Sequence, residues 1–152
     1  MTSTTAISED RDLTRVERSL VDWLLDHGTP DAIRYRPHLD TARVAARCCC
    51  GCASIDFAID GVVPTSGEPI SILSDYEWCD AHGRLFGVFV FSRCELLAGL
   101  ELWSQDGLAT ADYLPDVCQL RPFGTTSVGE QSHATEPAVG SVLKSTRIAP
   151  AR

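Results

Sequence analysis

The first part of the chain repeats apolar residues at helical spacing. Between Leu13 and His27 they recur every three or four positions, which places them on one face of a helix. Ser8 is a typical cap residue, the acidic residues after it complement the positive end of a helix, and Gly28 is a stop signal. The pattern predicts a helix over residues 9–27 and a second, shorter helix over residues 31–36.

From residue 41 onwards apolar and polar positions alternate, as in strands that bury one face. The predicted strands are residues 43–48, 54–60, 70–79, 85–91 and 96–104. Gly87 interrupts an almost continuous apolar run, which indicates a bulge or a close neighbour in the sheet. We therefore predict an α+β fold in which the N-terminal helix and one short helix pack on a five-stranded antiparallel meander sheet.

The two ends of the chain differ in composition from its middle. Residues 1–8 are small and polar, and Thr, Ser, Gly, Ala and Pro dominate residues 124–152, so neither segment is expected to bury a core. We expect a disordered N-terminus over 1–8, a single α+β domain over 9–123 and a disordered tail over 124–152. A chain of 152 residues is of a suitable length for one domain.

Acidic charge is concentrated in the predicted domain. Residues 1–123 hold ten arginines and nineteen acidic residues, and the whole chain has a net charge of −8. Such a surface repels phosphate, so we expect no nucleic-acid binding and favour a basic protein as partner. No apolar stretch is long enough for a bilayer and the N-terminus lacks the features of a signal peptide, so we expect a cytoplasmic protein with reduced thiols and no membrane contact. The sequence leaves the oligomeric state open.

Four of the seven cysteines lie within five residues, in the segment Arg47-Cys48-Cys49-Cys50-Gly51-Cys52-Ala53-Ser54-Ile55-Asp56. With the later Leu97-x-x-Leu100-Glu101, this segment resembles a family of small bacterial α+β proteins that have no established function. The resemblance covers about residues 12–123 and supports the fold, but it implies no catalytic residue. Cys49 and the C-terminal tail lie outside the shared pattern.

A cysteine-rich turn can gather thiolates around Zn²⁺. Two residues separate Cys49 from Cys52, which lets both sulfurs reach one ion, whereas Cys50-x-Cys52 alone is a poor match. Cys79 and His82 flank the next hairpin and offer a second pair of ligands. The sequence thus offers a zinc site made of Cys49, Cys52, Cys79 and His82, on condition that the two turns meet. The alternative is that Cys48 and Cys52 are small buried residues beside a bend.

A reactive thiol or a pair of carboxylates would instead indicate an enzyme. Arg47 can lower the pKa of a neighbouring thiol, but a strand follows the Cys-x-x-Cys spacing, whereas a thioredoxin-like motif requires a helix. The sequence contains no nucleophile elbow, no phosphate-binding glycine motif and no zinc-protease motif. An enzyme is therefore the least favoured of three hypotheses, and we assign no catalytic residue.

Acidic residues also occupy strand positions. Asp56, Asp75, Glu77 and Glu101 fall on predicted strands, and Trp103 lies two residues after Glu101 on the same strand face. Such residues form the solvated side of a half-buried sheet, and a tryptophan among carboxylates can also anchor a basic partner. Our leading hypothesis is a non-enzymatic binding protein, comparable in type alone to immunity proteins, that uses this acidic face and no cofactor. The zinc-stabilised module is the alternative.

Overall fold

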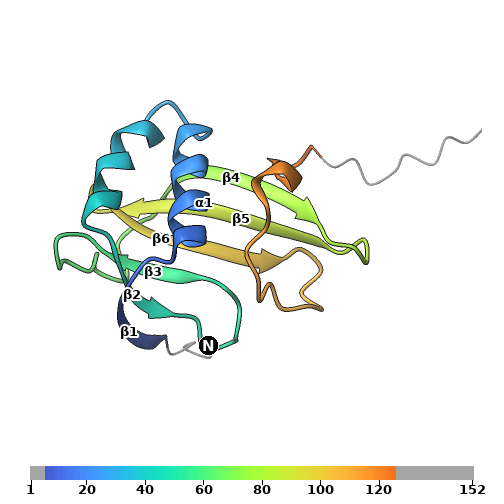
Figure 1. Ribbon diagram of the computed structural model, residues 1–152, viewed down its shortest axis with the longest axis horizontal. Coiled ribbons are helices and arrows are strands. Elements are labelled where there is room, and N and C mark those ends of the chain that lie inside the picture. Colours follow the sequence, from blue (N-terminus) through green and yellow to red (C-terminus); the bar gives the residue numbers. More distant parts are fainter. Residues whose placement is uncertain (1–5, 126–152) are drawn as a thin grey trace, which may run out of the picture.

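The computed structural model describes residues 6–125 (Figure 1). Of the two segments predicted to be disordered, 1–8 and 124–152, residues 1–5 and 126–152 fall outside this range. The described chain has an α+β fold with one α-helix, two 3₁₀ helices and a seven-stranded antiparallel sheet. Between residues 6 and 125, no helix is long and apolar enough to cross a membrane.

The first helix begins later than the pattern predicts. Helix α1 spans Arg15–Asp26 and the 3₁₀ helix η1 spans Ala32–Asp40. Thr14 is the N-cap, because its hydroxyl accepts a hydrogen bond from the Glu17 amide while the Glu17 carboxylate accepts one from the Thr14 amide. The predicted start at residue 9 is wrong, because this capping box starts the helix and Ile7–Asp12 forms strand β1 instead.

The sheet contains seven strands, so the predicted number of five is wrong. The strands after β1 are β2 Arg43–Arg47, β3 Ile55–Ala58, β4 Ser71–Cys79, β5 Leu85–Arg93, β6 Leu96–Ser104 and β7 Arg121–Pro122, and the 3₁₀ helix η2 spans Val117–Gln119. The two additional strands, β1 and β7, are the edges of the sheet. Because edge strands are often polar or contain proline, apolar alternation does not reveal them.

The strand order is β1-β2-β3-β6-β5-β4-β7, so the sheet is not a simple meander. Strands β4, β5 and β6 pair with their neighbours in sequence as predicted, but β3 pairs with β6. The connection from β3 to β4 therefore crosses the positions of β6 and β5 in the sheet. The tight turn between β5 and β6 uses Cys94 and Glu95 at positive φ values of 49° and 60°. This topology places β3, β6 and β5 side by side within the sheet.

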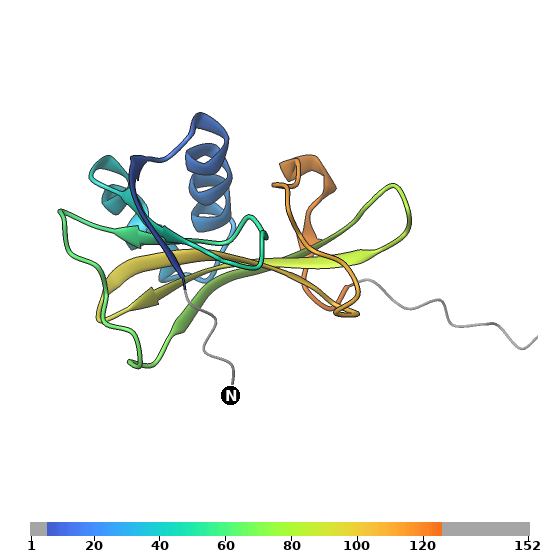
Figure 2. The same cartoon turned by 90° about the horizontal axis from the view of Figure 1, so that it is seen from below.

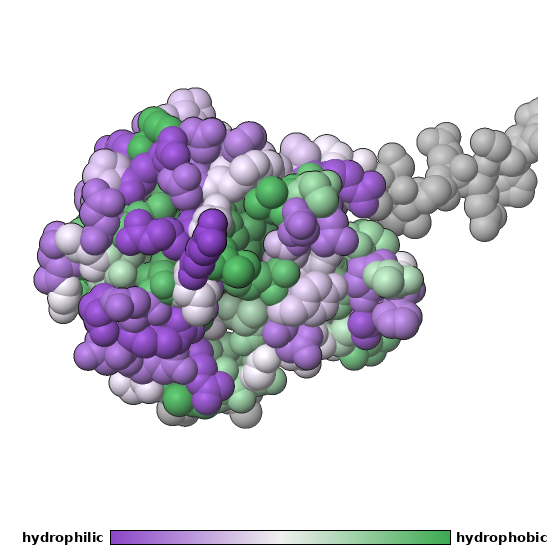
Figure 3. Space-filling view, in the orientation of Figure 1, coloured by the Kyte–Doolittle hydropathy of each residue, from purple (hydrophilic) through white to green (hydrophobic). Residues whose placement is uncertain are grey.

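In the part of the chain that the structure describes, helices cover only one face of the sheet (Figure 2). Helices α1 and η1 and the segment that carries η2 lie on that side. Figure 3 shows that the outer surface of this side is mostly hydrophilic, with hydrophobic side chains between α1 and the segment after β6. The core lies between these helices and the sheet. Its fully buried members come from α1 and from alternate strand positions and include Val21, Leu24, Phe57, Trp78, Phe86, Val88 and Leu100.

Candidate functional site

The side of the sheet without helices carries all five residues that the sequence proposes for a contact surface. Val88 and Leu102 pair across β5 and β6 and are buried in the core, so the neighbouring residues on each strand point to the opposite side. The register aligns Asp75 with Phe89 and Glu101, Glu77 with Gly87 and Trp103, and Asp56 with Gly99 and Phe91. We call the surface formed by Asp56, Asp75, Phe89, Phe91, Glu101 and Trp103 the open face.

Glu77 differs from the other four predicted contact residues because it is buried. Only 2% of the residue is exposed, and the side-chain amide of Gln105 donates a 3.1 Å hydrogen bond to its carboxylate. Beside it the Trp103 indole lies over Gly87, where an added Cβ would come within 2.8 Å of three indole atoms. The indole also packs on Phe123, with ring centroids 5.6 Å apart. Glu77 therefore supports the open face but offers no accessible carboxylate.

The three remaining carboxylates of the open face have raised pKa values. Partial burial raises the pKa of Glu101 and the negative charge of Asp56 raises it further, whereas a hydrogen bond with the Ser54 side chain acts in the opposite direction. Burial also raises the pKa of Asp56, although the Arg93 guanidinium acts in the opposite direction. Burial and the charge of Glu77 raise the pKa of Asp75. The ionised form of each group is thus less stable here than in water.

Most arginines of the described chain are paired with carboxylates away from the open face. The paired arginines are Arg11, Arg34, Arg36, Arg43, Arg47 and Arg84. Within residues 6–125, no ion pair includes Asp56, Asp75 or Glu101. The Arg93 guanidinium borders the open face but lies over the Phe91 ring, 5.5 Å from its centroid. The open face of the described chain therefore presents partly desolvated carboxylates that form no ion pair, although the charge of Arg93 acts on Asp56.

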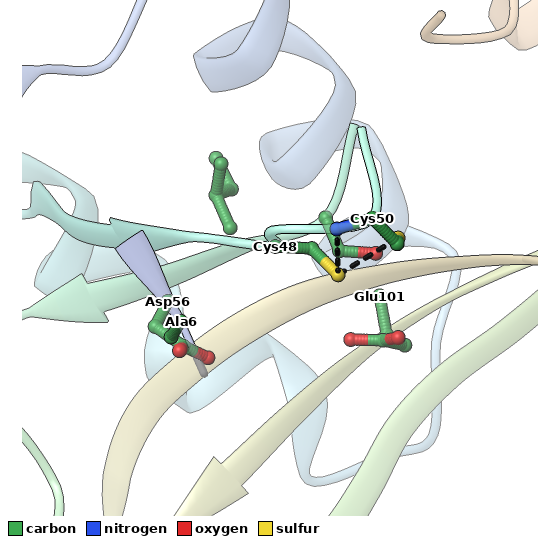
Figure 4. Close-up of a pocket in the computed structure, with 7 residues that line it drawn as sticks. Ala6, Cys48, Cys50, Asp56 and Glu101 are labelled. Carbon is green, nitrogen blue, oxygen red and sulfur yellow. Dashed lines mark hydrogen bonds between the residues drawn. The ribbon is translucent and has the colours of Figure 1, made fainter. Parts of the chain in front are cut away.

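Hollows in the open face connect its aromatic part to the cysteine-rich turn. One hollow of about 390 Å³ is lined by Ile70, Phe89, Phe91, Arg93, Glu101 and Trp103. A second, of about 370 Å³, is lined by Ala6, Cys48, Cys50, Ser54, Ile55, Asp56 and Glu101. Figure 4 shows Asp56, Glu101, Cys48 and Cys50 around this hollow, with Asp56 next to Ala6 and apart from the two thiols. Because Glu101 lines both hollows, the turn and the open face form one continuous surface.

The cysteine-rich turn, residues 48–54, joins β2 to β3. It closes with a 3.2 Å hydrogen bond from the Cys48 amide to the Ser54 carbonyl, and Gly51 provides the positive φ of 88° that reverses the chain. The sulfurs of Cys48 and Cys50 are 2.8 Å apart, and the Cys52 thiol donates a 3.2 Å hydrogen bond to the Ser54 hydroxyl. The ligand atoms of Cys48, Cys50 and Cys52 all lie within 4.8 Å of one another.

The structure does not bring together the four residues of the predicted zinc site. In the described chain, the metal-ligating side chains that lie close enough to hold one ion are those of Cys48, Cys50 and Cys52. This cluster includes neither Cys49 nor Cys79 nor His82. Two strands, β6 and β5, separate β3 from the strand that ends at Cys79, which corresponds to about 14 Å at the usual strand spacing. The observed cluster was not predicted because Cys50-x-Cys52 is a poor match to the usual spacing of zinc ligands, whereas the three sulfurs gather at a two-residue period.

Hydrogen bonds between the thiols change their acidity. The hydrogen bond with Cys50 raises the pKa of Cys48 to about 12, and partial burial acts in the same direction. The same hydrogen bond lowers the pKa of Cys50, and contacts with the Cys52 thiol and amide lower it further. Cys50 therefore ionises before Cys48, and its neighbours stabilise the thiolate.

Comparisons with known proteins identify no relative from which a role could be transferred. No family model matches the chain, and neither the curated proteins nor the solved structures yield a significant match. The family resemblance drawn from the cysteine segment and the Leu97-x-x-Leu100-Glu101 strand stays a prediction. A function for this chain is therefore proposed from the chemistry of the open face and of the cysteine-rich turn.

Proposed function

We propose that this chain is a non-enzymatic binding protein whose open face holds a basic, partly apolar segment of a partner protein. The observation that carries the proposal is the set of partly desolvated carboxylates, Asp56, Asp75 and Glu101, on a sheet face that no helix of residues 6–125 covers. None of them has an ion-pair partner in residues 6–125. A lysine or arginine of a partner would supply a positive charge and charge-assisted hydrogen bonds to these carboxylates.

Apolar side chains around these carboxylates favour a protein partner over a free cation. Phe89 and Trp103 line the same hollow as Glu101 and are only partly buried. The surface continues through Ile70, Ile72 and Phe123, which are 43%, 41% and 44% exposed. Exposed apolar patches with a polar rim are typical of protein–protein contact sites, and tryptophan is prominent among the residues that dominate binding energies.

Binding of a defined peptide to the full-length protein tests this proposal. The probe is a ten-residue fluorescent peptide that alternates lysine and leucine, titrated at low salt and at 0.15 M salt. We expect saturable binding that weakens with salt, because exposed charges are screened at that ionic strength. Glu101→Gln and Asp75→Asn should each weaken binding by about three- to tenfold, while preserving side-chain shape.

Asp31 provides the matched control. It is exposed at the start of η1, and its side chain makes no capping hydrogen bond. Asp31→Asn removes the same charge from the side of the sheet that carries the helices, so it should leave the affinity unchanged. Equal losses in Asp31→Asn and Glu101→Gln would show that net charge alone attracts the peptide and would reject the open face as the binding surface. Binding of a glutamate–leucine peptide with the same affinity would reject the requirement for a basic partner.

A further inference from the structure

We propose that Cys48, Cys50 and Cys52 form a three-thiolate site for monovalent copper. The inference does not depend on the open face binding a partner, because it concerns a different set of side chains. The cluster contains three soft ligands from one short turn, and their sulfurs lie within 4.8 Å of one another. A group of this kind is distinct from the isolated cysteines of the chain, Cys79, Cys94 and Cys118, which belong to no such cluster among residues 6–125.

The spacing of the three sulfurs is close to that of a trigonal site with a bound metal ion. Metal–thiolate bonds of about 2.3 Å, the value for zinc, would hold the sulfurs of a trigonal site about 4 Å apart. The sulfurs of Cys48 and Cys50, now 2.8 Å apart, would therefore separate by about 1 Å, which a small rotation of the exposed Cys50 side chain permits. Cys50 is exposed and both residues line the hollow of about 370 Å³, so an ion can enter from solvent.

The number of ligands favours copper over zinc. Structural zinc sites almost always have four ligands, whereas thiolates are the preferred ligands of soft Cu(I). Asp56 and Glu101 line the same hollow, but no carboxylate or histidine in the described chain joins the three sulfurs within 4.8 Å. Within residues 6–125, the cluster thus contains three sulfur ligands and no fourth ligand.

The binding step conserves electrons and releases protons. Three S–H bonds break, three S–Cu bonds form, and copper stays in the monovalent state throughout. The protons pass to solvent, so the apparent affinity should rise with pH over the range in which the thiols are protonated. The fourth cysteine of the turn, Cys49, is exposed and lies outside the cluster, so it takes no part in the step.

Titration of reduced, full-length protein with Cu(I) under anaerobic conditions tests the site. A chromophoric Cu(I) chelator competes for the metal, and the number of ions retained per chain is measured together with the ultraviolet thiolate-to-copper absorption. We expect one ion per chain in the wild type and in Cys49→Ser. Cys48→Ser, Cys50→Ser and Cys52→Ser should each weaken retention by at least about tenfold, because each removes one of three ligands.

Three outcomes would overturn the proposal. A loss in Cys49→Ser equal to that in Cys50→Ser would show that no specific set of sulfurs binds the ion. Absence of Cu(I) binding, or tighter retention of Zn²⁺ than of Cu(I) when zinc alone is the probe, would reject the copper assignment. Circular dichroism of each variant establishes that it is folded, and the lysine–leucine peptide assay, performed without metal, reports on the open face separately.

Discussion

Replacement of Gly87 by alanine should disrupt the open face through a single methyl group. Gly87 lies beneath the Trp103 indole, and its backbone does not need a positive φ, so alanine is allowed by the main chain. The new Cβ would lie within 2.8 Å of three indole atoms, a distance that forces the ring to move. Once displaced, the ring cannot keep its contact with Phe123, at present 5.6 Å between centroids.

The magnitude follows from two opposing effects. Overpacking of a close contact costs about 1–3 kcal/mol, whereas removal of a glycine from a strand contributes about 0.5–1 kcal/mol in the favourable direction. We therefore expect Gly87→Ala to lower the free energy of unfolding by about 1–2 kcal/mol. In a Trp103→Ala background the clash is absent, and the same substitution should be neutral or stabilising.

Urea denaturation of the four proteins of this double-mutant cycle, followed by far-ultraviolet circular dichroism, measures the coupling between the two positions. The expected coupling energy is about 1–3 kcal/mol. The lysine–leucine peptide should also bind less tightly to Gly87→Ala, because the ring that lines the hollow has moved. An equal loss of stability from Gly87→Ala in both backgrounds would refute the close approach of Trp103 as its cause.

Three further substitutions test other parts of the structure. Ser54→Ala should lower the free energy of unfolding by about 1–3 kcal/mol in chemical denaturation, because the buried hydroxyl bonds both the amide and the carbonyl of Leu102. Burial disfavours the Glu17 carboxylate, but hydrogen bonds from Arg11 and Thr14 outweigh this effect and lower the pKa of Glu17 from 4.5. Glu17→Gln should therefore be less stable than wild type near pH 7. In a series of denaturation curves at different pH values, the difference in stability should shrink as the pH falls below about 4.5. Burial raises the pKa of Glu101, so the ionised form of this side chain opposes folding. Glu101→Gln should therefore be more stable than wild type at pH 7 and have no advantage at acidic pH. The same variant should bind the peptide less tightly than wild type.

The central part of the fold can be predicted from the sequence because its pattern is local. The fifth predicted strand, residues 96–104, coincides with β6, and the turn at Cys94 and Glu95 is as expected. Apolar alternation indicates which side of each strand is buried, and it assigns Asp56, Asp75 and Glu101 correctly to one face. Gly87 inside an apolar run likewise indicates a close neighbour, which is Trp103.

Other features depend on contacts between distant segments and could not be predicted in this way. Strand β1 is polar, and it exists because its backbone pairs with β2, a partner more than thirty residues away. The position of β3 beside β6 separates Cys52 from Cys79, and alternation within one strand carries no information on strand order. Glu77 is placed on the correct side, but its burial beside Trp103 depends on how one particular side chain lies across the sheet.

Mapping of the peptide on the protein by nuclear magnetic resonance is the most direct test of the proposed function. Amide resonances of the ¹⁵N-labelled full-length chain are recorded during titration with the lysine–leucine peptide. We expect the largest shifts along β5 and β6, at Phe89, Glu101 and the indole N–H of Trp103, with little change in α1. Shifts confined to α1 and η1, or no saturable shift at millimolar peptide, would contradict a binding role for the open face.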